Sequence, residues 1–273
     1  MIFKDRAVII TGGSEGVGAE TARLFADAGA NLMLVARGKK KLEAIAEELR
    51  DKTRVEINPM DVSDTEACVN LFKKTEYEYG RVDVLVNNAG YHARGPLDAI
   101  DADDLARMVD VNLRAPIVLS RLAMPYLKKS DAAAIVNVGS LAGRTPVPGS
   151  ATYGATKAGL RSFTYAISEE LRGSNIKVAV VSPGPIDTGF IMSDIDAVSD
   201  LTFSQPISTA REVAQAVLDL CGNSVREQSM PPSSGLLTML TYIAPALARY
   251  ARPMLERKGQ RVKARLKVEK GQT

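Results

Sequence analysis

The sequence contains only two cysteines and a single histidine. Cys68 and Cys221 lie far apart in the chain, and neither belongs to a Cys-x-x-Cys pair or stands beside a histidine. This pattern excludes the usual zinc-binding spacings and offers no disulfide framework. We therefore expect no metal site, a reducing compartment, and two thiols that pack in the core as small apolar groups.

The sequence also has no long hydrophobic run. Its longest apolar stretch, residues 235–248, contains Pro245 and is shorter than the roughly 18 to 20 residues that a membrane-spanning helix needs. The first six residues do not have the layout of a secretory signal peptide. We expect a cytoplasmic protein, and association of its C-terminal segment with a membrane surface stays open.

A large excess of one charge is absent as well, because the net charge is only +3. The charge is unevenly placed: residues 249–273 hold nine basic and two acidic side chains, which leaves the rest of the chain at −4. A body with net negative charge and few aromatic residues is a poor nucleic-acid binder. The sequence thus favours a small-molecule partner over nucleic acid.

Short runs rich in Val, Ile and Leu alternate with segments whose apolar residues recur every three to four positions. We expect strands at residues 7–10, 32–36, 55–57, 82–86, 135–138, 178–181 and 227–230. We expect helices at residues 19–28, 42–49, 65–79, 103–128, 153–171 and 210–221. Strict alternation of strand and helix predicts an α/β fold with a doubly wound parallel sheet of about seven strands and helices on both faces.

Residues 1–230 are expected to form one domain. Two segments of the chain do not follow the alternation of strands and helices. Residues 183–209, rich in Pro, Ser, Asp and Gly, are long for a connection, and residues 190–210 are expected to form a loop or lid over the substrate. Residues 231–273 form an extension that is apolar first and basic afterwards, with a helical pattern.

The first expected strand leads directly into a glycine-rich loop, which a helix follows. The loop reads Thr11, Gly12, Gly13, Ser14, Glu15, Gly16, Val17, Gly18. Glycines at such a turn let the backbone approach a pyrophosphate, whose charge is stabilised at the positive end of the helix. The order strand, glycine loop, helix predicts a Rossmann-type dinucleotide site, although a glycine pattern alone also describes a flexible turn.

The glycine spacing, Gly-x-x-x-Gly-x-Gly, resembles that of the short-chain dehydrogenase/reductase family. The family's Asn-Asn-Ala-Gly and Asp-Val segments are matched at residues 87–90 and 61–62, and its Pro-Gly loop at residues 183–188. The resemblance implies an oxidoreductase that binds NAD or NADP and assembles as a homodimer or homotetramer. Beside the glycine loop, it assigns cofactor contacts to Arg37, Asp61, Val62, Asn88, Ala89, Gly90, Tyr153, Lys157, Pro183, Gly184, Ile186 and Thr188.

The end of the second strand discriminates between NAD and NADP, because a carboxylate there binds the ribose 2′-hydroxyl and repels a 2′-phosphate. Ala36 stands where NAD-binding members of the family usually carry Asp, and Arg37 follows with a guanidinium that can pair with the phosphate. We expect NADP. Arg37 and the lysines at 39–41 also fit a solvated loop, and Glu15 stands where many NADP-binding members carry a basic residue.

Tyr153 and Lys157 lie four residues apart at the start of an expected helix, so that their side chains share a face. A positive charge about 4 Å from a phenol is worth roughly 4 kcal/mol at an effective dielectric constant of about 20. That energy lowers the phenol pKa, ordinarily near 10, by at most about three units. Such pairs are also common on ordinary helix surfaces, but here Ser140 follows the fifth strand and completes a set that resembles the family's catalytic residues.

The resemblance gives each member of this set a role. Tyr153 donates a proton to a carbonyl oxygen that Ser140 also holds, and Lys157 binds the nicotinamide ribose and lowers the pKa of Tyr153. Asn112 supports a water molecule that relays protons to the solvent. Position alone makes Leu141, Val147 and Phe190 expected walls of the substrate pocket, and these side chains suit an apolar ketone.

Two placements remain open. His92 either faces the substrate mouth or lies on the surface, and we favour the surface. The extension after residue 230 either anchors the protein at a membrane surface, through apolar burial and basic attraction to anionic lipid, or forms a helix pair over the active site or a dimer seam. Packing is favoured, because buried apolar helices are commoner than anchors.

These features predict an NADP(H)-dependent oxidoreductase that interconverts a ketone and a secondary alcohol. The expected substrate is a bulky apolar carbonyl compound of 3-ketoacyl, sphingoid-base or steroid-like type. The alternative is a dinucleotide-binding sensor or scaffold that keeps the fold without turnover, and it predicts cofactor binding without catalysis.

Overall fold

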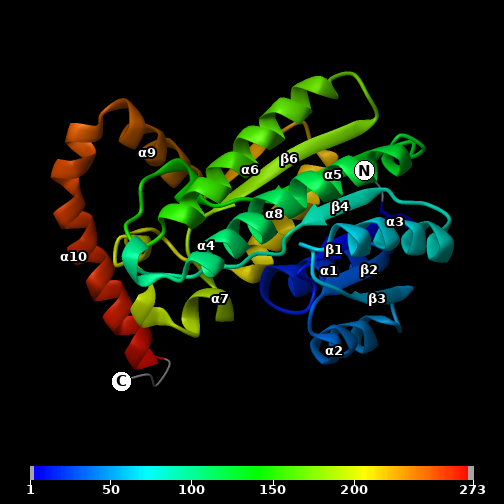
Figure 1. Cartoon of the computed structure of the whole chain (residues 1–273), viewed down its shortest axis with the longest axis horizontal. Coiled ribbons are helices and arrows are strands. Elements are labelled where there is room, and N and C mark those ends of the chain that lie inside the picture. The colour runs from blue at the N-terminus through cyan, green and yellow to red at the C-terminus, as the bar shows by residue number, and fades with distance from the viewer. Residues whose placement is uncertain (1–2, 270–273) are drawn as a thin grey trace.

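The computed structural model describes residues 3–269, apart from the side chains of residues 239 and 240. Seven strands form one parallel sheet in the order β3-β2-β1-β4-β5-β6-β9 (Figure 1). They are β1 (Ala7–Thr11), β2 (Asn31–Ala36), β3 (Val55–Pro59), β4 (Val84–Asn87), β5 (Ala133–Val138), β6 (Ile176–Pro183) and β9 (Glu227–Met230). The doubly wound parallel sheet predicted from the alternation of strands and helices is confirmed.

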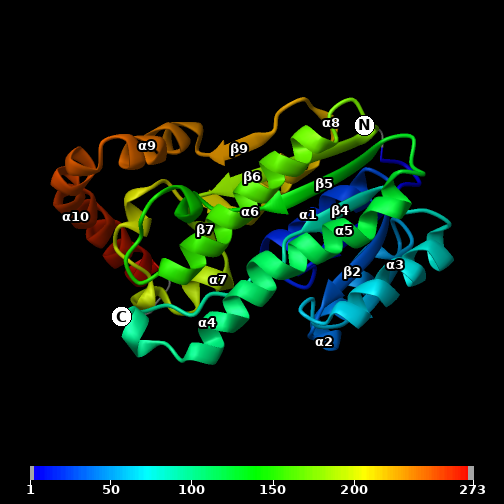
Figure 2. The same cartoon turned by 45° about the horizontal axis from the view of Figure 1, so that its top comes forward.

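Helices cover both faces of this sheet (Figures 1 and 2). One layer contains α1 (Gly16–Asp27), α2 (Lys39–Leu49) and α8 (Ala210–Gly222); the other contains α3 (Thr65–Tyr79), α5 (Ala115–Leu127) and α6 (Ala151–Glu170). Successive residues of a strand enter opposite layers. Ile10 of β1 belongs to the same buried cluster as Phe25 of α1, whereas Ile9 belongs to the cluster of Phe72 on α3. Burial on both sides explains why the central strands are apolar throughout.

The strand order reverses between β1 and β4. In an open parallel sheet, the crevice beyond the carboxyl ends of the strands at such a point is where ligands bind. Thr11 ends β1 and Asn87 ends β4, and the two strands are hydrogen-bonded neighbours. The glycine loop and the Asn-Asn-Ala-Gly segment therefore meet at this crevice.

The helix expected at residues 103–128 is confirmed as helical backbone from 102 to 127, and it contains one turn of π-helix. After a short turn, η1 (Leu97–Ala99), α4 (Ala102–Val109) passes into one turn of π-helix, η2 (Asp110–Arg114), before α5 begins. Pro116 favours this π turn, because it has no amide hydrogen to donate to the carbonyl of Asn112 four residues earlier. Such π turns occur frequently at functional sites.

The long connection between β6 and α8 is folded. β7 (Ile186–Asp187) and β8 (Ser208–Thr209) pair in parallel, and between them lie α7 (Gly189–Met192), η4 (Ile195–Ala197) and η5 (Thr202–Ser204). A small hydrophobic cluster holds this segment together and includes Val262 and Leu266 of the C-terminal helix. The segment expected as a loop or lid is thus a compact unit that packs against the extension.

The extension consists of α9 (Pro232–Ile243) and α10 (Pro245–Glu269), which form an arch beyond the sheet (Figure 2). Both helices are fastened to the body. Arg144 donates a hydrogen bond of 3.0 Å to the carbonyl of Gly235 in α9. A Cβ on Gly259 of α10 would lie 1.8 Å from the carbonyl oxygen of Asp200, so only glycine allows this approach. Among the described residues, no helix is long and apolar enough to cross a lipid bilayer.

Candidate active site

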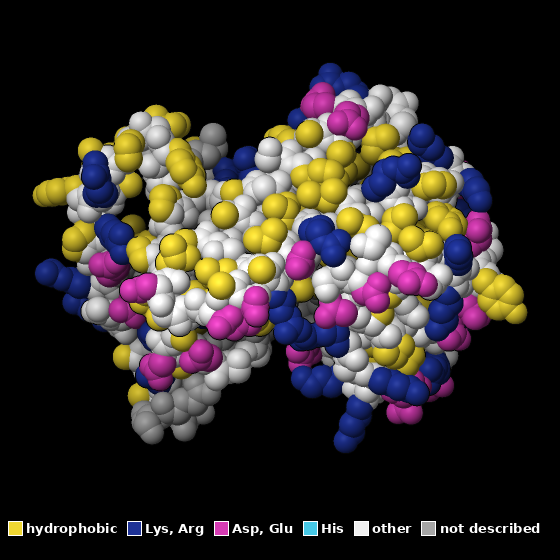
Figure 3. Space-filling model, in the orientation of Figure 1, with side chains coloured by type: hydrophobic (Ala, Val, Ile, Leu, Met, Phe, Trp, Pro, Cys, Tyr) yellow, Lys and Arg dark blue, Asp and Glu magenta, His cyan; other side chains and the backbone are white. Residues whose placement is uncertain are grey.

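A cavity of about 1840 Å³ lies over the crevice at the carboxyl ends of the strands. The glycine loop lines one end of it, and α9 and α10 line the other. Figure 3 shows the hollow between the arch of these helices and the body. The volume exceeds the roughly 300 to 1,000 Å³ of an ordinary small-molecule site, and so leaves room for a dinucleotide and a substrate together.

Most of the side chains that the sequence assigned to the site line this cavity. Four do not: Thr11, Gly13, Gly18 and Asn112 lie behind its wall. Thr11 joins the two strand ends, because its hydroxyl accepts hydrogen bonds from the amides of Asn88 (3.0 Å) and Ala89 (3.1 Å). A Cβ on Gly18 would lie 2.0 Å from the carbonyl oxygen of Gly12, so the loop can rest against α1 only with glycine there.

The start of α1 fits an anionic group. The helix begins at Gly16, and the residue before it, Glu15, makes no side-chain hydrogen bond to the first amides. These amides are the donors that a helix leaves unpaired at its N-terminus, where its dipole is positive. Ser14, Glu15, Gly16 and Val17 all line the cavity, so a pyrophosphate can be placed against this turn.

The next part of the cavity wall carries basic side chains beside the end of β2. Arg37 and Lys41 both line the cavity, whereas the lysines at 39 and 40 do not. Glu15 forms an ion pair with Lys41 at 2.6 Å, so its charge is compensated. Asp61 and Val62, which follow β3, also line the cavity. Burial acts to raise the pKa of Asp61, but hydrogen bonds from Ser63 and the charge of Arg37 together lower it.

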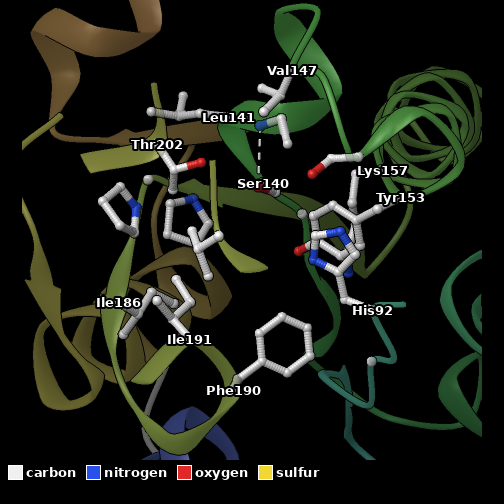
Figure 4. A pocket seen from close by; sticks show the side chains of 18 of the residues that line it. His92, Ser140, Leu141, Val147, Tyr153, Lys157, Ile186, Phe190, Ile191 and Thr202 are labelled. Carbon is white, nitrogen blue, oxygen red and sulfur yellow. Dashed lines mark hydrogen bonds between the residues drawn. The ribbon is translucent and has the colours of Figure 1, made fainter. Parts of the chain in front are cut away.

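Ser140, Tyr153 and Lys157 come together on one wall of the cavity (Figure 4). Ser140 follows β5 and caps η3 (Leu141–Arg144), where its hydroxyl accepts a hydrogen bond of 3.1 Å from the amide of Ala142. Tyr153 lies in the first turn of α6, and Lys157 lies one turn further along. Ser140 and Tyr153, thirteen positions apart in the sequence, therefore meet because β5 ends and α6 begins at this side of the sheet.

Burial dominates the electrostatics of this wall. Burial raises the pKa of Tyr153, while the Ser140 hydroxyl and the charge of Arg94 lower it, and the net shift is upward. The Lys157 ammonium donates a hydrogen bond of 2.8 Å to the carbonyl of Val138, and burial lowers its pKa to about 8. Desolvation therefore sets the direction of both pKa shifts in the protein without cofactor, and the role of Lys157 in lowering the pKa of Tyr153 stays a prediction.

Asn112 is fully buried behind this wall, and its carboxamide holds the backbone of Tyr91. Its Oδ1 accepts a hydrogen bond from the Tyr91 amide and its Nδ2 donates to the Tyr91 carbonyl, both at 2.7 Å. Nδ2 also lies 3.4 Å from the hydroxyl of Thr156 in α6. The π turn thereby fixes the segment after the Asn-Asn-Ala-Gly motif relative to the helix that carries Tyr153.

His92 lies in the cavity, so the surface position favoured from the sequence is wrong. Its ring stacks on that of Tyr153, with the centroids 4.0 Å apart and the planes at 13° (Figure 4). Phe190 completes an aromatic group, 6.3 Å from each of the other two ring centroids. Burial, together with the charges of Arg94 and Lys157, lowers the pKa of His92 to about 3, so the imidazole is neutral at physiological pH.

The far end of the cavity is mostly apolar. Leu141 is buried, Val147 is partly buried and Phe190 is exposed, and all three line this end. The Pro-Gly loop contributes Pro183, Gly184, Ile186 and Thr188. The arch closes the end with apolar side chains that the sequence reasoning did not assign to the site: Leu237, Leu247, Met254 and Leu255.

Five further cationic residues of the cavity were not predicted from the sequence: Lys41, Arg94, Arg107, Arg249 and Arg252. The sequence does not distinguish Lys41 from its neighbouring lysines, but its position in the first turn of α2 places it beside Glu15. The one sequence signal for Arg94 is its place two residues after His92, in the segment that follows the Asn-Asn-Ala-Gly motif.

Comparisons with known proteins agree with this geometry. The family model for short chain dehydrogenase matches residues 6–198. Sulfoacetaldehyde reductase 2 of Chromohalobacter salexigens is 39% identical, over 68% of this chain and 74% of that protein. A 3-oxoacyl-acyl-carrier-protein reductase of Chlamydia muridarum is 32% identical, over 81% of this chain and 92% of that protein.

A solved structure extends the likeness to three dimensions. The crystal structure of a short chain dehydrogenase from Burkholderia cenocepacia in complex with NADP has a TM-score of 0.76 and 29% sequence identity, and the match covers 84% of this chain and 97% of that one. The family model covers the glycine loop, the strand ends and the Ser140, Tyr153 and Lys157 wall. The chain therefore belongs to the short-chain dehydrogenase/reductase family of oxidoreductases.

Proposed function

We propose that the chain is an NADPH-dependent reductase that converts a ketone to a secondary alcohol, with Tyr153 as the proton donor. The observation that carries this proposal is the common cavity. The wall formed by Ser140, Tyr153 and Lys157 and the glycine loop before α1 line the same space, which has room for cofactor and substrate side by side.

The residues present fit an NADP molecule. Gly12, Gly16 and the start of α1 would hold the pyrophosphate, and Arg37 with Lys41 would pair with the 2′-phosphate. Ala36 places no carboxylate at the end of β2 to repel that phosphate. The cofactor, when bound, supplies the hydride, and the chain supplies the proton and the orientation.

Tyr153 holds the proton that the carbonyl oxygen receives. Its raised pKa keeps the phenol protonated at neutral pH, which is the state an acid needs before transfer. Ser140, whose hydroxyl is oriented by the Ala142 amide, would hold the carbonyl oxygen beside Tyr153. Lys157 would turn from the Val138 carbonyl toward the nicotinamide ribose, and its positive charge would then stabilise the phenolate that remains. Asn112 would support the water that returns a proton.

The substrate proposed here is a ketone with an apolar body. Leu141, Val147 and Phe190 would contact it from the core side, and the arch of α9 and α10 would cover it from the other. Removing apolar surface from water at about 25 cal/mol per Å² favours a bulky molecule of 3-ketoacyl, sphingoid-base or steroid-like type. The relatives named as sulfoacetaldehyde and 3-oxoacyl reductases support carbonyl reduction as the reaction.

The test is consumption of NADPH by the purified protein with a panel of such ketones, followed by identification of the alcohol formed. We expect turnover with NADPH and a much lower kcat/KM with NADH. Tight NADPH binding without turnover on any ketone would overturn the proposal and favour a dinucleotide sensor or scaffold. Better use of NADH than of NADPH would overturn the assignment of Arg37 and Lys41.

For the extension, we propose that α9 and α10 wall the substrate cavity in an assembly of two or four copies. The Arg144 and Gly259 contacts to the body support packing. However, apolar and aromatic side chains of the extension remain exposed, among them Leu236, Tyr242, Ile243 and Tyr250. A membrane surface could therefore contact the extension of a protein that we propose is cytoplasmic, and this contact can be tested. In cosedimentation with anionic liposomes, we expect the wild-type protein to stay in the supernatant. If it pellets with the liposomes, and if changing Tyr242 and Ile243 to serine returns it to the supernatant, the extension is a membrane anchor instead.

A further inference from the structure

Arg94 is a cation inside the substrate end of the cavity. Its guanidinium lies 5.3 Å from the centroid of the Phe190 ring and donates a hydrogen bond of 2.7 Å to the Phe190 carbonyl. Phe190 in turn lies 6.3 Å from the ring centroid of Tyr153. Arg94 is partly buried, and desolvation lowers its pKa even though Tyr153 and Asp194 act to raise it.

No carboxylate compensates this charge at close range. Among the described residues, the ion pairs identified do not include Arg94, the Phe190 carbonyl accepts its identified hydrogen bond, and Asp194 acts on it through its charge. A guanidinium has five N–H donors in a planar fork that matches a carboxylate. Most of those donors are therefore available to a bound molecule.

Basic side chains also outnumber acidic ones among the other residues that line the substrate end of the cavity. The acidic residues that line the cavity in the described part of the chain are Glu15 and Asp61, and both lie at the cofactor end. Lys157 and Arg249 line the substrate end together with Arg94, and so does Arg252, whose charge is compensated by Glu256 at 2.8 Å. Focused positive charge in a cleft with apolar walls attracts an anionic substrate.

We propose that Arg94 binds an acidic group of the substrate, so that the chain reduces oxo acids, in which a carboxylate or sulfonate accompanies the ketone. This rests on the proposed reductase function and narrows its substrate class. The acidic group is unchanged in the reaction: the carbonyl carbon gains a hydride, its oxygen gains the Tyr153 proton, and the bond to the anion-bearing chain stays intact.

A simpler role for Arg94 is to clamp α7 through the Phe190 carbonyl. The two roles differ in what they predict. A clamp shapes the cavity for every substrate alike, whereas an anion site affects only substrates that carry a negative charge. Substrate pairs that differ in charge and little else therefore separate the two roles.

The experiment measures kcat/KM with NADPH for 5-oxohexanoate, its methyl ester and 4-oxopentane-1-sulfonate, and for 4-acetylbenzoate against its methyl ester. Charge-assisted hydrogen bonds should make the acids better than the esters by on the order of 10- to 100-fold. Comparison of the carboxylate with the sulfonate then shows which anion the site prefers.

Arg94→Gln removes the charge and keeps an N–H that can reach the Phe190 carbonyl. We expect it to abolish the preference for the acids while changing kcat/KM for the esters by less than about threefold. Arg94→Lys should keep part of the preference, because the charge remains without the fork. Arg50→Gln, directly after the end of α2, removes an equal charge from a residue that does not line the cavity and should change neither value. NADPH binding by each variant shows that it is folded.

Equal losses for acids and esters in Arg94→Gln would overturn the anion site and leave Arg94 as a clamp. Wild-type protein that reduces the esters as well as, or better than, the acids would overturn it too, while the reductase function would stand. No reduction of any acid, ester or neutral ketone would overturn the proposed function itself.

Discussion

Replacing Lys157 by methionine should stabilise the folded protein in the absence of cofactor. The Lys157 side chain is buried, its ammonium donates a hydrogen bond to the Val138 carbonyl, and burial lowers its pKa from 10.5 to about 8. At about 1.4 kcal/mol per pKa unit, this shift opposes folding by roughly 3 kcal/mol at neutral pH. The lost hydrogen bond costs about 1 kcal/mol, so the expected net gain is about 2 kcal/mol.

The gain should depend on pH in a defined direction. Below pH 8 the folded and the unfolded chain both hold the proton of Lys157, and the penalty in the wild type is complete. Between pH 8 and pH 10.5 the folded chain has released that proton while the unfolded chain still binds it, so wild-type stability rises with pH. The advantage of Lys157→Met should therefore shrink over this interval.

Urea unfolding of the cofactor-free proteins, followed by circular dichroism at pH 7 and pH 9.5, measures both effects. The same variant should be nearly inactive, because the ammonium is proposed to act in the reaction. An unfolding free energy for Lys157→Met equal to or below that of the wild type at pH 7 would refute the reasoning. So would an advantage that is as large at pH 9.5 as at pH 7.

Three other outcomes are expected. Arg37→Ala should raise the KM for NADPH by on the order of 10- to 100-fold and leave that for NADH nearly unchanged, because only NADPH carries the 2′-phosphate; parallel changes would contradict its assignment. His92→Phe should keep most of the activity by preserving the stack on Tyr153, whereas His92→Ala should lower kcat about tenfold. Because the pKa of His92 is about 3, this residue should add no titration to kcat/KM between pH 5 and pH 7.5. A wild-type inflection in this range that disappears in His92→Phe would contradict this prediction. Arg144→Met should destabilise the protein by about 3 kcal/mol, because it breaks the buried ion pair with Glu227 and the hydrogen bond to the Gly235 carbonyl of α9. An unchanged melting temperature would show that other contacts hold α9 and α10 in place.

The fold could be predicted from the sequence because the signal for each element is local and repeated. Apolar runs at strand positions and amphipathic spacing at helix positions fix the element types, and strict alternation leaves a parallel, doubly wound sheet as the consistent arrangement. The π turn at η2 was harder to foresee. The segment 103–128 has a helical pattern throughout, and the missing amide hydrogen of Pro116 is no clear signal, because Pro125 in the same segment lies within regular α-helix.

The residues proposed for the reaction were predictable for a different reason. Their identities and spacing are characteristic of a family, so Ser140, Tyr153 and Lys157 could be selected without knowing any distance. Their electrostatics could not be predicted, because the sequence shows that Lys157 is four residues from Tyr153 and not that both are desolvated. Burial decides the direction of both pKa shifts, and burial is a property of the packed molecule.

His92 and Arg94 show the limit of local reasoning. Their positions depend on a tertiary contact, the pair of hydrogen bonds between the Asn112 side chain and the Tyr91 backbone. That contact joins residues 21 positions apart and directs the segment that follows into the cavity. A histidine and an arginine in a polar loop give no sign of this in the sequence, and both resemble ordinary surface residues.

The central claim is that Tyr153 supplies the proton, and Tyr153→Phe tests it most directly. The substitution removes one oxygen atom and keeps the ring that stacks on His92. The measurement is kcat for NADPH-dependent ketone reduction at pH 7, with the dissociation constant of NADPH determined in parallel. We predict a loss in kcat of on the order of 10²- to 10⁴-fold with NADPH binding nearly unchanged. Reduction by Tyr153→Phe at the wild-type rate would contradict the account.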